Sequence, residues 1–517
     1  MALPAFLDRT LDALSGLPVA QERDWFRKRL QRASLMLTAA PGVADQPTHR
    51  AGYLLSVNLA SRLYPRLWLD APSELCDAAE DLVRRINPDA DVVRGESRSG
   101  PALLYGMPTR GPGKVGVSAA GWRVDLHPAE AILRRAAGPA ALAAATIGSA
   151  ELFRRLIRDA LPPQKRRPSP PVAFNLLDWS EAIHENVVPS DPIDLGRAHL
   201  VGAGAVGEAA ALALSTVPLS GEFVPVDHEP VTLANLQRYV LATADDVGMA
   251  KTTLVARHFA GSALRVTEVP TPWGADERSG PGATVALVAL DTARGRIEVA
   301  ASLPNRAYNA FTGPNDLGWS RHERFGQAPC LACMYWPTGP VPNRHEVIAA
   351  ALGIHPERAL LYLIRPTHPV GLPALPSTTG QLSASADDLR RWTEQSLLDD
   401  LVERLVMLPA DAERWRGETL ESLYRDGYCG GAFVAGNQAG QRDSEVVVPL
   451  AMQSVFAGIM LATQAVVAAD PRLIVLRQES IEARIDLVAP FPQIVWRPRL
   501  RARGCICSDP DYGGQPF

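Results

Sequence analysis

A glycine-rich turn between an apolar strand and a helix is the feature that most constrains how this chain can fold. The turn follows the apolar residues 198–201, leads into the helical residues 209–214, and contains Gly202, Gly204 and Gly207. Glycines let the backbone approach a phosphate closely, and the N-terminus of the next helix offers unpaired N–H groups and a positive dipole end. The stretch therefore predicts a nucleotide-binding strand–turn–helix unit.

Polar residues after the turn distinguish the nucleotides that it could bind. Asp227 ends the next predicted strand, at about the spacing where a carboxylate meets ribose hydroxyls. Arg238 and Lys251 follow, with the amides of Asn235 and Gln237 beside them. An NAD site needs no cluster of cations beyond the acid, whereas two cations suit charge that develops on transferring phosphoryl oxygens. The pattern favours ATP; an NAD-binding oxidoreductase and a nucleotide-binding scaffold without turnover remain the alternatives.

Alternating strands and helices between residues 193 and 342 indicate the fold class. Strands are predicted at 198–201, 223–227, 264–269, 284–291 and 306–311. This alternation predicts an α/β fold with a doubly wound, mostly parallel, Rossmann-like sheet. Ligands of such sheets lie beyond the carboxyl ends of the strands, which is where Gly202, Asp227 and Asp291 fall.

Two consecutive motifs in this region resemble those of the ThiF/MoeB/E1 family. The first reads Asp-x-Glu-x-Val-x-x-x-Asn-Leu-Gln-Arg and ends at Arg238, and the second reads Asp-Val-Gly-x-x-Lys and ends at Lys251. The resemblance covers residues 195–335 closely and residues 445–510 more loosely. Enzymes of this family adenylate the C-terminal glycine of ubiquitin-like proteins, so the resemblance implies an ATP-dependent adenylation domain.

The resemblance also implies a role for each polar residue around the turn. ATP would lie on the glycines with Asp227 on its ribose, and Asn235 would position the phosphates or the ribose. Arg238 and Lys251 would stabilise the charge that develops as pyrophosphate leaves. Glu229 would support Arg238 or a bound metal ion.

Asp291 follows a continuous apolar stretch at 284–290, as expected for a buried parallel strand. The resemblance assigns this strand-end aspartate to Mg²⁺ on the ATP phosphates. One or two carboxylates together with phosphates and water are enough to hold Mg²⁺. The alternative is that Asp291 caps the helix that follows it.

Four of the six cysteines occur in two close pairs. They are Cys330, Cys333, Cys505 and Cys507. Four thiolates can form a closed tetrahedral zinc site of the structural kind. The family often has two Cys-x-x-Cys pairs at these places, whereas the second pair here is one residue shorter. Two separate reduced pairs without metal are the alternative.

Cys429 lies in the glycine-flanked sequence Tyr-Cys-Gly-Gly, which leaves a thiol accessible to a bulky reaction partner. It falls between the two cysteine pairs, roughly where the family places a thiol-bearing crossover segment. A thiolate there could attack the acyl-adenylate and form a thioester. The alternative is a structural cysteine in a tight turn.

The rest of the chain is divided by composition around this adenylation region. We expect an N-terminal α/β domain at 1–160, a proline-rich linker at 161–192, the first part of the adenylation domain at 193–342, a helical insertion at 343–445, and a return with a zinc-binding tail at 446–517. The N-terminal domain is either an inactive adenylation-like half or an unrelated accessory domain. In the first case, Arg23, Arg29 or Arg32 are candidates for an arginine lent to the ATP site.

Charge and composition exclude several classes of function. A net charge of −4 gives no drive toward nucleic acid or membrane surfaces. The first residues lack a basic region followed by an apolar core, so we expect no signal peptide. The longest apolar stretches, 136–150 and 455–469, are short for a membrane span and are predicted to be buried helices. Six cysteines in 517 residues indicate a reducing cytoplasm rather than a disulfide framework.

The glycine turn, the two motifs, the cysteine pairs and the family resemblance together predict an E1-like activating enzyme that uses ATP, Mg²⁺ and a structural Zn²⁺. Its expected partners are a ubiquitin-like or sulfur-carrier protein with a C-terminal glycine, and an E2-like protein. The architecture resembles bacterial E1-like proteins of ubiquitin-like conjugation operons, including those used against phage. An enzyme that stops at adenylation for a sulfur carrier is the alternative, and either an intrachain pseudo-dimer or a homodimer is compatible with the sequence.

Overall fold

The computed structural model describes most of the chain outside the insertion. The described residues are Phe6, Thr10, Leu11, Ala13, Leu14, 23–95, 100–130, 133–313, 316–323, 325–336, 344–352, 449–478 and 480–509. The chain divides into two compact units, residues 1–336 with 448–517 and residues 337–447. The insertion predicted at 343–445 lies outside the described residues apart from α10 (Arg344–Leu352), and Cys429 lies outside them altogether.

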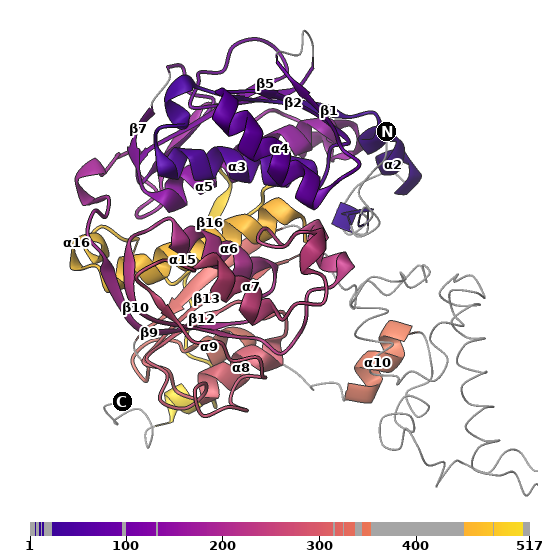
Figure 1. Ribbon diagram of the computed structural model, residues 1–517. Coiled ribbons are helices and arrows are strands. Elements are labelled where there is room, and N and C mark those ends of the chain that lie inside the picture. Colours follow the sequence, from indigo (N-terminus) through magenta and orange to yellow (C-terminus); the bar gives the residue numbers. More distant parts are fainter. Residues whose placement is uncertain are drawn as a thin grey trace, which may run out of the picture. The chain divides into compact units, whose positions relative to one another are not determined.

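The first sheet of the larger unit is formed by strands between residues 34 and 175 (Figure 1). Its strands are β1 (Ser34–Ala39), β2 (Arg66–Asp70), β3 (Asp91–Arg94), β4 (Ala102–Tyr105), β5 (Lys114–Gly121), β6 (Arg123–Leu126), β7 (Leu133–Ala136) and β8 (Val172–Asn175). The order is β3-β2-β1-β4-β5-β6-β8, and β7 pairs with β5. Neighbours from β3 to β5 are parallel, whereas β6 is antiparallel to both β5 and β8. The accompanying helices are α2 (Arg23–Gln31), α3 (Pro47–Ser61), α4 (Ser73–Ile86) and α5 (Gly138–Leu156).

The second sheet contains the predicted nucleotide site. Its strands are β9 (Ile193–Val201), β10 (Leu219–Val226), β11 (Arg265–Val266), β12 (Val285–Val288), β13 (Arg306–Thr312), β14 (Leu317–His322), β15 (Glu482–Ile485) and β16 (Ile494–Arg497). The order is β11-β10-β9-β12-β13-β14-β15-β16. Neighbours from β11 to β13 are parallel and the last three strands join antiparallel, which gives the predicted α/β fold. The helices are α6 (Ala205–Ser215), α7 (Lys251–His258), α8 (Ala293–Ala301), α9 (Leu331–Tyr335), α15 (Ala451–Ala469) and α16 (Pro471–Ile474).

The two sheets repeat one strand order. In each sheet, the strand that comes first in the sequence lies between the second and the fourth strands of that sheet. The parallel strands come first along the chain, and antiparallel strands form one edge of the sheet. They differ at the turn after that first strand. β9 leads through the glycine turn directly into α6, whereas β1 leads into a short 3-10 helix at Pro41–Val43 before α3 begins. The N-terminal half of the larger unit, which contains the first sheet, thus has the topology of the second half without its glycine turn.

The proline-rich segment 161–192 is more than the linker that we expected. Its residues 172–175 form β8, which pairs antiparallel with β6 at the edge of the first sheet. Proline cannot donate to a strand ladder and is confined to edges and strand starts. The strand therefore begins directly after Pro171, the last proline of the run, where the backbone can pair again.

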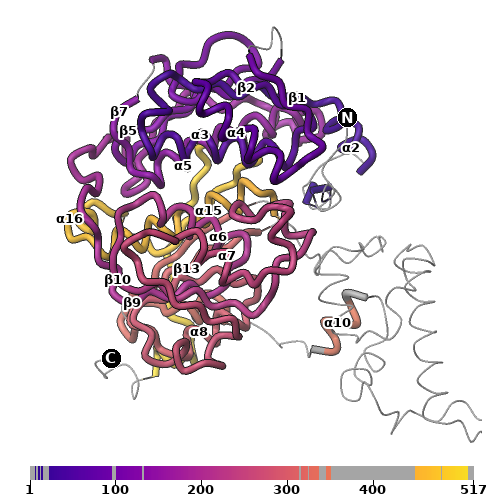
Figure 2. The backbone as a smooth tube through the Cα atoms, in the orientation of Figure 1, coloured from indigo at the N-terminus to yellow at the C-terminus, as the bar shows by residue number. Residues whose placement is uncertain are grey.

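α15 is the central helix of the larger unit. It packs on α6, α5, β13 and β14, and Figures 1 and 2 show it in yellow, crossing close to α6. It is long and apolar enough to cross a membrane by length and composition, but 89% of its apolar window is buried within the described structure. A helix that is apolar all round is expected in such a core.

Gly458 sets how closely α15 and α6 can approach. A Cβ atom there would lie 2.4 Å from the carbonyl oxygen of Val206 and 2.6 Å from the Cβ of Ala209. Alanine is a better helix former than glycine by about 1 kcal/mol, but overpacking against backbone typically costs about 1–3 kcal/mol. We therefore expect Gly458→Ala to lower the melting temperature, measured by thermal denaturation. Ala468→Val, at a partly exposed position of the same helix, is the control, and a raised melting temperature for Gly458→Ala would contradict the close contact.

Candidate active site

The glycine turn has a geometry that only small residues permit. Gly202, directly after β9, has a φ of +94°, and a Cβ there would lie 2.8 Å from the carbonyl oxygen of Ala289. Gly204 is the N-cap of α6, and a Cβ on Gly207 would lie 2.1 Å from the carbonyl oxygen of Gly202. The chain is therefore folded tightly at the start of α6, where first-turn N–H groups have no partner within the helix.

Asp227 lies directly against this turn. Its Oδ2 accepts a hydrogen bond from the backbone N–H of Ala203 at 2.8 Å, and its Oδ1 accepts one from Glu229 at 2.9 Å. The carboxylate thus joins the end of β10 to the glycine turn in a fixed orientation. Each oxygen has a further lone pair with which it can accept a hydrogen bond from a ligand hydroxyl.

Lys251 is the first residue of α7 and is 3% exposed. Its Nζ donates to Glu229 Oε2 at 2.5 Å and lies 5.5 Å from the ring centroid of Tyr239. Burial alone would lower the pKa of Lys251, but Tyr239, Asp227 and Glu229 offset it and raise the pKa above its usual value. The ammonium group is therefore charged and held beside the turn. Glu229, which we expected near Arg238 or a metal, contacts Lys251.

Arg238 and Asn235 are positioned by a short 3-10 helix, Leu233–Gln237. Asn235 Oδ1 accepts a hydrogen bond from the N–H of Thr232 at 2.9 Å as part of a capping box, so one end of this amide is already engaged. Arg238 caps the end of the helix, and its guanidinium has no hydrogen bond or ion pair within the described residues. Burial lowers its pKa, while the field of Tyr239 and Asp291 opposes that shift. A half-buried cation with no hydrogen-bonded anion among the described residues is suited to a phosphate ligand.

Asp291 is exposed beyond the end of β12. The alternative that it caps the next helix is not supported, since the N-cap of α8 is Thr292, whose Oγ1 accepts the N–H of Gly295 at 3.1 Å. The buried side chain of Arg296 donates to the carbonyl oxygen of Leu290 and, at 3.1 Å, to Asn309. The residue before Asp291 is thereby anchored, while Asp291 itself is exposed.

Sequence reasoning missed Tyr239 and Glu208. A Cβ on Gly204 would meet the Tyr239 hydroxyl at 3.3 Å, so this ring lies over the glycine turn. Glu208 is fully buried in α6, and its Oε2 accepts the N–H of Leu241 at 2.9 Å. Tyr239 could have been found as the residue next to Arg238. Nothing in the local pattern marks Glu208, because a glutamate in the first turn of a helix is ordinarily solvated.

Burial raises the pKa of Glu208 to about 8, against the opposing effects of the Leu241 N–H, Arg62 and Lys251. A carboxyl whose folded pKa lies above its unfolded value binds more protons in the native state, so its contribution to stability falls as pH rises from about 4.5 toward 8. Glu208→Gln keeps an acceptor for Leu241 without a charge. We expect its advantage in the free energy of unfolding, measured by urea denaturation, to grow between pH 5 and pH 9. Equal pH dependence in both proteins would contradict this.

The four paired cysteines come together at one place. Their sulfur atoms all lie within 4.8 Å of one another, with Cys330 to Cys505 at 3.5 Å and Cys333 to Cys507 at 3.2 Å. A tetrahedral Zn²⁺ with bonds of about 2.3 Å needs sulfur atoms about 3.8 Å apart, so the cluster fits such an ion closely. A hydrogen bond from the Cys330 thiol lowers the pKa of Cys333 to about 5, which favours a thiolate. The four cysteines therefore form one cluster, and the alternative of two cysteine pairs that are separate in space is wrong.

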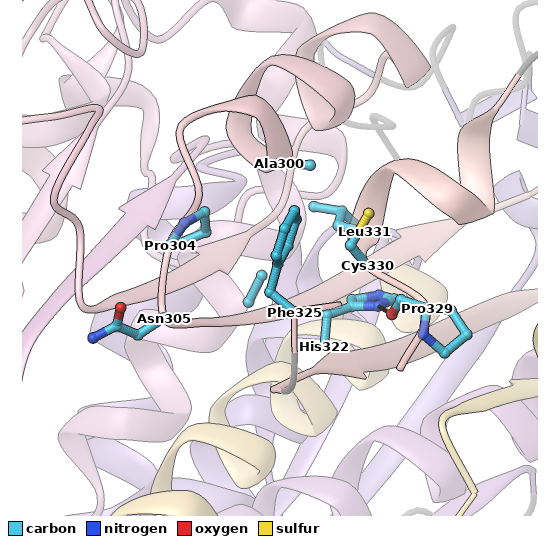
Figure 3. Close-up of a pocket in the computed structure, with 9 residues that line it drawn as sticks. Ala300, Pro304, Asn305, His322, Phe325, Pro329, Cys330 and Leu331 are labelled. Carbon is cyan, nitrogen blue, oxygen red and sulfur yellow. Dashed lines mark hydrogen bonds between the residues drawn. The ribbon is translucent and has the colours of Figure 1, made fainter. Parts of the chain in front are cut away.

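A small cavity and a buried histidine lie beside the cysteine cluster. Figure 3 shows Cys330 and Leu331 beside His322 and Phe325, at a small cavity of about 20 Å³. His322 lies 2.9 Å, through its Nδ1, from the carbonyl oxygen of Pro329, and burial lowers its pKa to about 4. It is neutral and fixes the residue before Cys330.

Of the three arginines of the N-terminal half that could be lent to the ATP site, Arg29 is bonded to groups of its own half. Arg29 donates to the carbonyl oxygen of Leu156 at 3.0 Å and lies 3.7 Å from the carboxylate of Asp159. Arg29 is thus bonded within its own half. For Arg23 and Arg32 the assignment stays a prediction.

Comparison with known proteins identifies the family of the domain that contains the candidate site. Residues 191–305 match the ThiF family. Along nearly its whole length, the chain is similar to the "Uncharacterized protein y4jF" of Sinorhizobium fredii, with 31% identity over 537 residues that cover 99% of this chain and 96% of that protein.

Crystal structures of E. coli MccB are among the structures that resemble parts of the chain. MccB with MccA-N7isoASN is 14% identical over 60% of this chain and 67% of MccB, with a TM-score of 0.33. MccB with ATP is 23% identical over 27% of this chain and 44% of MccB, with a TM-score of 0.24. In the second comparison the chain spans less than half the length of the relative that it matches.

The ThiF match covers the residues of the candidate site, from the glycine turn through Asp227 and Arg238 to Lys251 and Asp291. The full-length relative carries the similarity through the first sheet and the cysteine tail. This chain therefore contains a ThiF-family domain, belongs to the ThiF/MoeB/E1-like superfamily and, within it, belongs to the same family as y4jF.

Proposed function

We propose that this protein is an E1-like activating enzyme, which uses ATP to adenylate the C-terminal glycine of a ubiquitin-like or sulfur-carrier protein. The observation that carries the proposal is that Asp227 is bonded to the tight glycine turn and that the buried Lys251 lies beside Tyr239, whose ring covers this turn. Arg238 precedes Tyr239 in the chain, and its charge interacts with Tyr239 and Asp291. A site for NAD would not require either cation.

The reaction needs little covalent chemistry from the protein. A carboxylate oxygen of the carrier attacks the α-phosphorus of ATP, a new carboxyl–phosphate bond forms, and the bond to the β-phosphate breaks with release of pyrophosphate. N–H groups at the start of α6 hold the phosphates, and Asp227 accepts hydrogen bonds from the ribose hydroxyls. Arg238 and Lys251 stabilise the negative charge that develops on the transferring and leaving oxygens.

Two metal ions belong to the proposal. Asp291, which is exposed beyond the end of β12, would hold Mg²⁺, which neutralises charge on the phosphates when it is bound. Cys330, Cys333, Cys505 and Cys507 would hold a structural Zn²⁺. That ion would connect the C-terminal tail to α9, since two of its ligands come from each segment.

The later steps involve residues outside the described part of the chain. Cys429 would take the activated acyl group as a thioester, with release of AMP, and pass it to an E2-like protein. If the enzyme stops at adenylation, the same pocket serves a sulfur carrier. The half of the larger unit that contains the first sheet would act as an inactive partner of the adenylation half within one chain. The enzyme would work in the cytoplasm, and its architecture suggests that it belongs to an antiphage conjugation operon.

ATP–pyrophosphate exchange with small carrier proteins ending in Gly-Gly tests the adenylation step. We expect carrier-dependent exchange in the wild-type protein and a loss of about 10²-fold or more in Asp291→Ala, since a charge-stabilising contact at the phosphates is lost. Arg294→Ala, which removes an exposed i,i+4 pair with Glu298, is the control near the same strand end.

Binding of NAD without any exchange would refute the proposal. A covalent carrier adduct sensitive to thiol reductant would support Cys429, and its persistence in Cys429→Ala would remove that assignment while leaving adenylation intact.

A further inference from the structure

The loop that carries Arg238 is held by a side chain of the other half of the chain. Arg62, the C-cap residue of α3, is fully buried. Its Nη1 donates to the carbonyl oxygen of Leu236, and its Nη2 donates to that of Ala242 at 3.1 Å. One planar guanidinium therefore bridges two backbone positions on either side of Arg238.

Asn58, one turn earlier in α3, completes this contact. Its Nδ2 donates to the carbonyl oxygen of Val240 at 2.9 Å, and its Oδ1 accepts a hydrogen bond from Arg62 Nε at 2.9 Å. Glu208 of α6 accepts a hydrogen bond from the N–H of Leu241 in the same loop. The loop is thus held through three carbonyls by the first half and through one amide by the nucleotide-binding helix.

We propose that Arg62, with Asn58, is a positioning residue for the adenylation site, through which the first half fixes the loop that presents Arg238 to the nucleotide. This inference rests on the proposed function. Arg62 differs from a lent arginine, because its donors are used on backbone carbonyls and on Asn58.

The geometry explains why arginine is required at this position. Its five N–H donors lie in a fixed plane and can reach separate acceptors at once, whereas lysine is a compact point donor on a flexible stem. Arg62→Lys keeps the charge but cannot bridge Leu236 and Ala242 in the same way. The loop then has freedom to turn Arg238 away from the phosphates without loss of the rest of the fold.

The first experiment is hydrogen exchange of the full-length protein without nucleotide. In Arg62→Lys we expect amides between residues 236 and 243 to exchange on the order of 10-fold faster, while those of β1 and β9 keep their protection. Asn58→Ala should give a smaller change in the same loop. Arg66→Lys, which alters a half-exposed ion pair of 2.7 Å with Asp91, is the matched control and should change neither region. Unaltered loop exchange overturns the proposal, as does a uniform rise across the whole unit.

The second experiment is a double-mutant cycle on ATP–pyrophosphate exchange. If Arg62 acts through Arg238, Arg62→Lys should lower kcat about 10-fold with little change in KM for ATP, and should have less than about a 2-fold effect in the Arg238→Ala background. Equal losses in both backgrounds contradict a positioning role. If the wild-type protein shows no exchange, the proposed function fails, and the hydrogen-exchange result still decides whether the first half fixes the loop.

Discussion

We expect replacement of Lys251 by methionine to lower the kcat of ATP–pyrophosphate exchange by about 10²- to 10³-fold, the effect of removing one preorganised charge-stabilising group from an active site. The ammonium group is buried beside the glycine turn and is held there by Glu229 and the Tyr239 ring. Charge on the leaving pyrophosphate develops as the reaction proceeds. We therefore expect KM for ATP to change much less than kcat.

The fold should tolerate this substitution. The Glu229 side chain is 44% exposed, so it regains water when its partner is removed. Lys165→Met is the matched control, because Lys165 also forms a partly buried ion pair, at 2.6 Å to Asp486, at a place unrelated to the pocket. It should leave exchange unchanged. If Lys251→Met keeps half of the wild-type rate at an unaltered melting temperature, Lys251 does not stabilise the transition state.

Removing the metal from the cysteine cluster should destabilise the larger unit strongly. We expect one zinc ion per chain by elemental analysis, and its loss in the Cys333→Ser, Cys507→Ser double variant. Structural zinc contributes apparent binding free energies of about 10–16 kcal/mol in small domains. Even a fraction of this, roughly 4 kcal/mol, would lower the melting temperature by about 5 °C in a unit of this size.

Cys76→Ser is the control for the cysteine substitutions. Cys76 is buried in α4 and its thiol donates to the carbonyl oxygen of Ala71 at 3.3 Å, away from the cluster. It should keep the zinc ion. A wild-type protein that contains no zinc after purification in zinc-supplemented medium, and whose melting temperature is insensitive to chelators, would remove the ion from the proposal.

Much of the second sheet could be predicted from the sequence, because its signals are local. The apolar runs that became β9, β10 and β12 each end next to a glycine or an acid of the pocket, and the parallel order places those ends at one edge. The bounds were less accurate. The expected strand at 264–269 shrinks to Arg265–Val266 at the edge of the sheet, where pairing is available on one side only.

The residues of the candidate site remain predictions from the sequence, and their contacts could not be foreseen from it. Spacing identified Lys251 and Glu229 separately, whereas their ion pair depends on how α7 packs against the end of β10. The role of Asn235 in a capping box was not foreseen either, since the sequence shows the amide but not which groups lie near it.

The sequence by itself determined the glycine turn, the acids at the strand ends, the two cations and the two cysteine pairs, because backbone conformation and short spacings dictate these features. Only the tertiary structure decided that Arg62 reaches the carbonyl oxygens of Leu236 and Ala242, and that Cys330 lies 3.5 Å from Cys505. Such contacts join residues that are more than a hundred positions apart. They follow from which buried faces pack together, and no local pattern of residues encodes that choice.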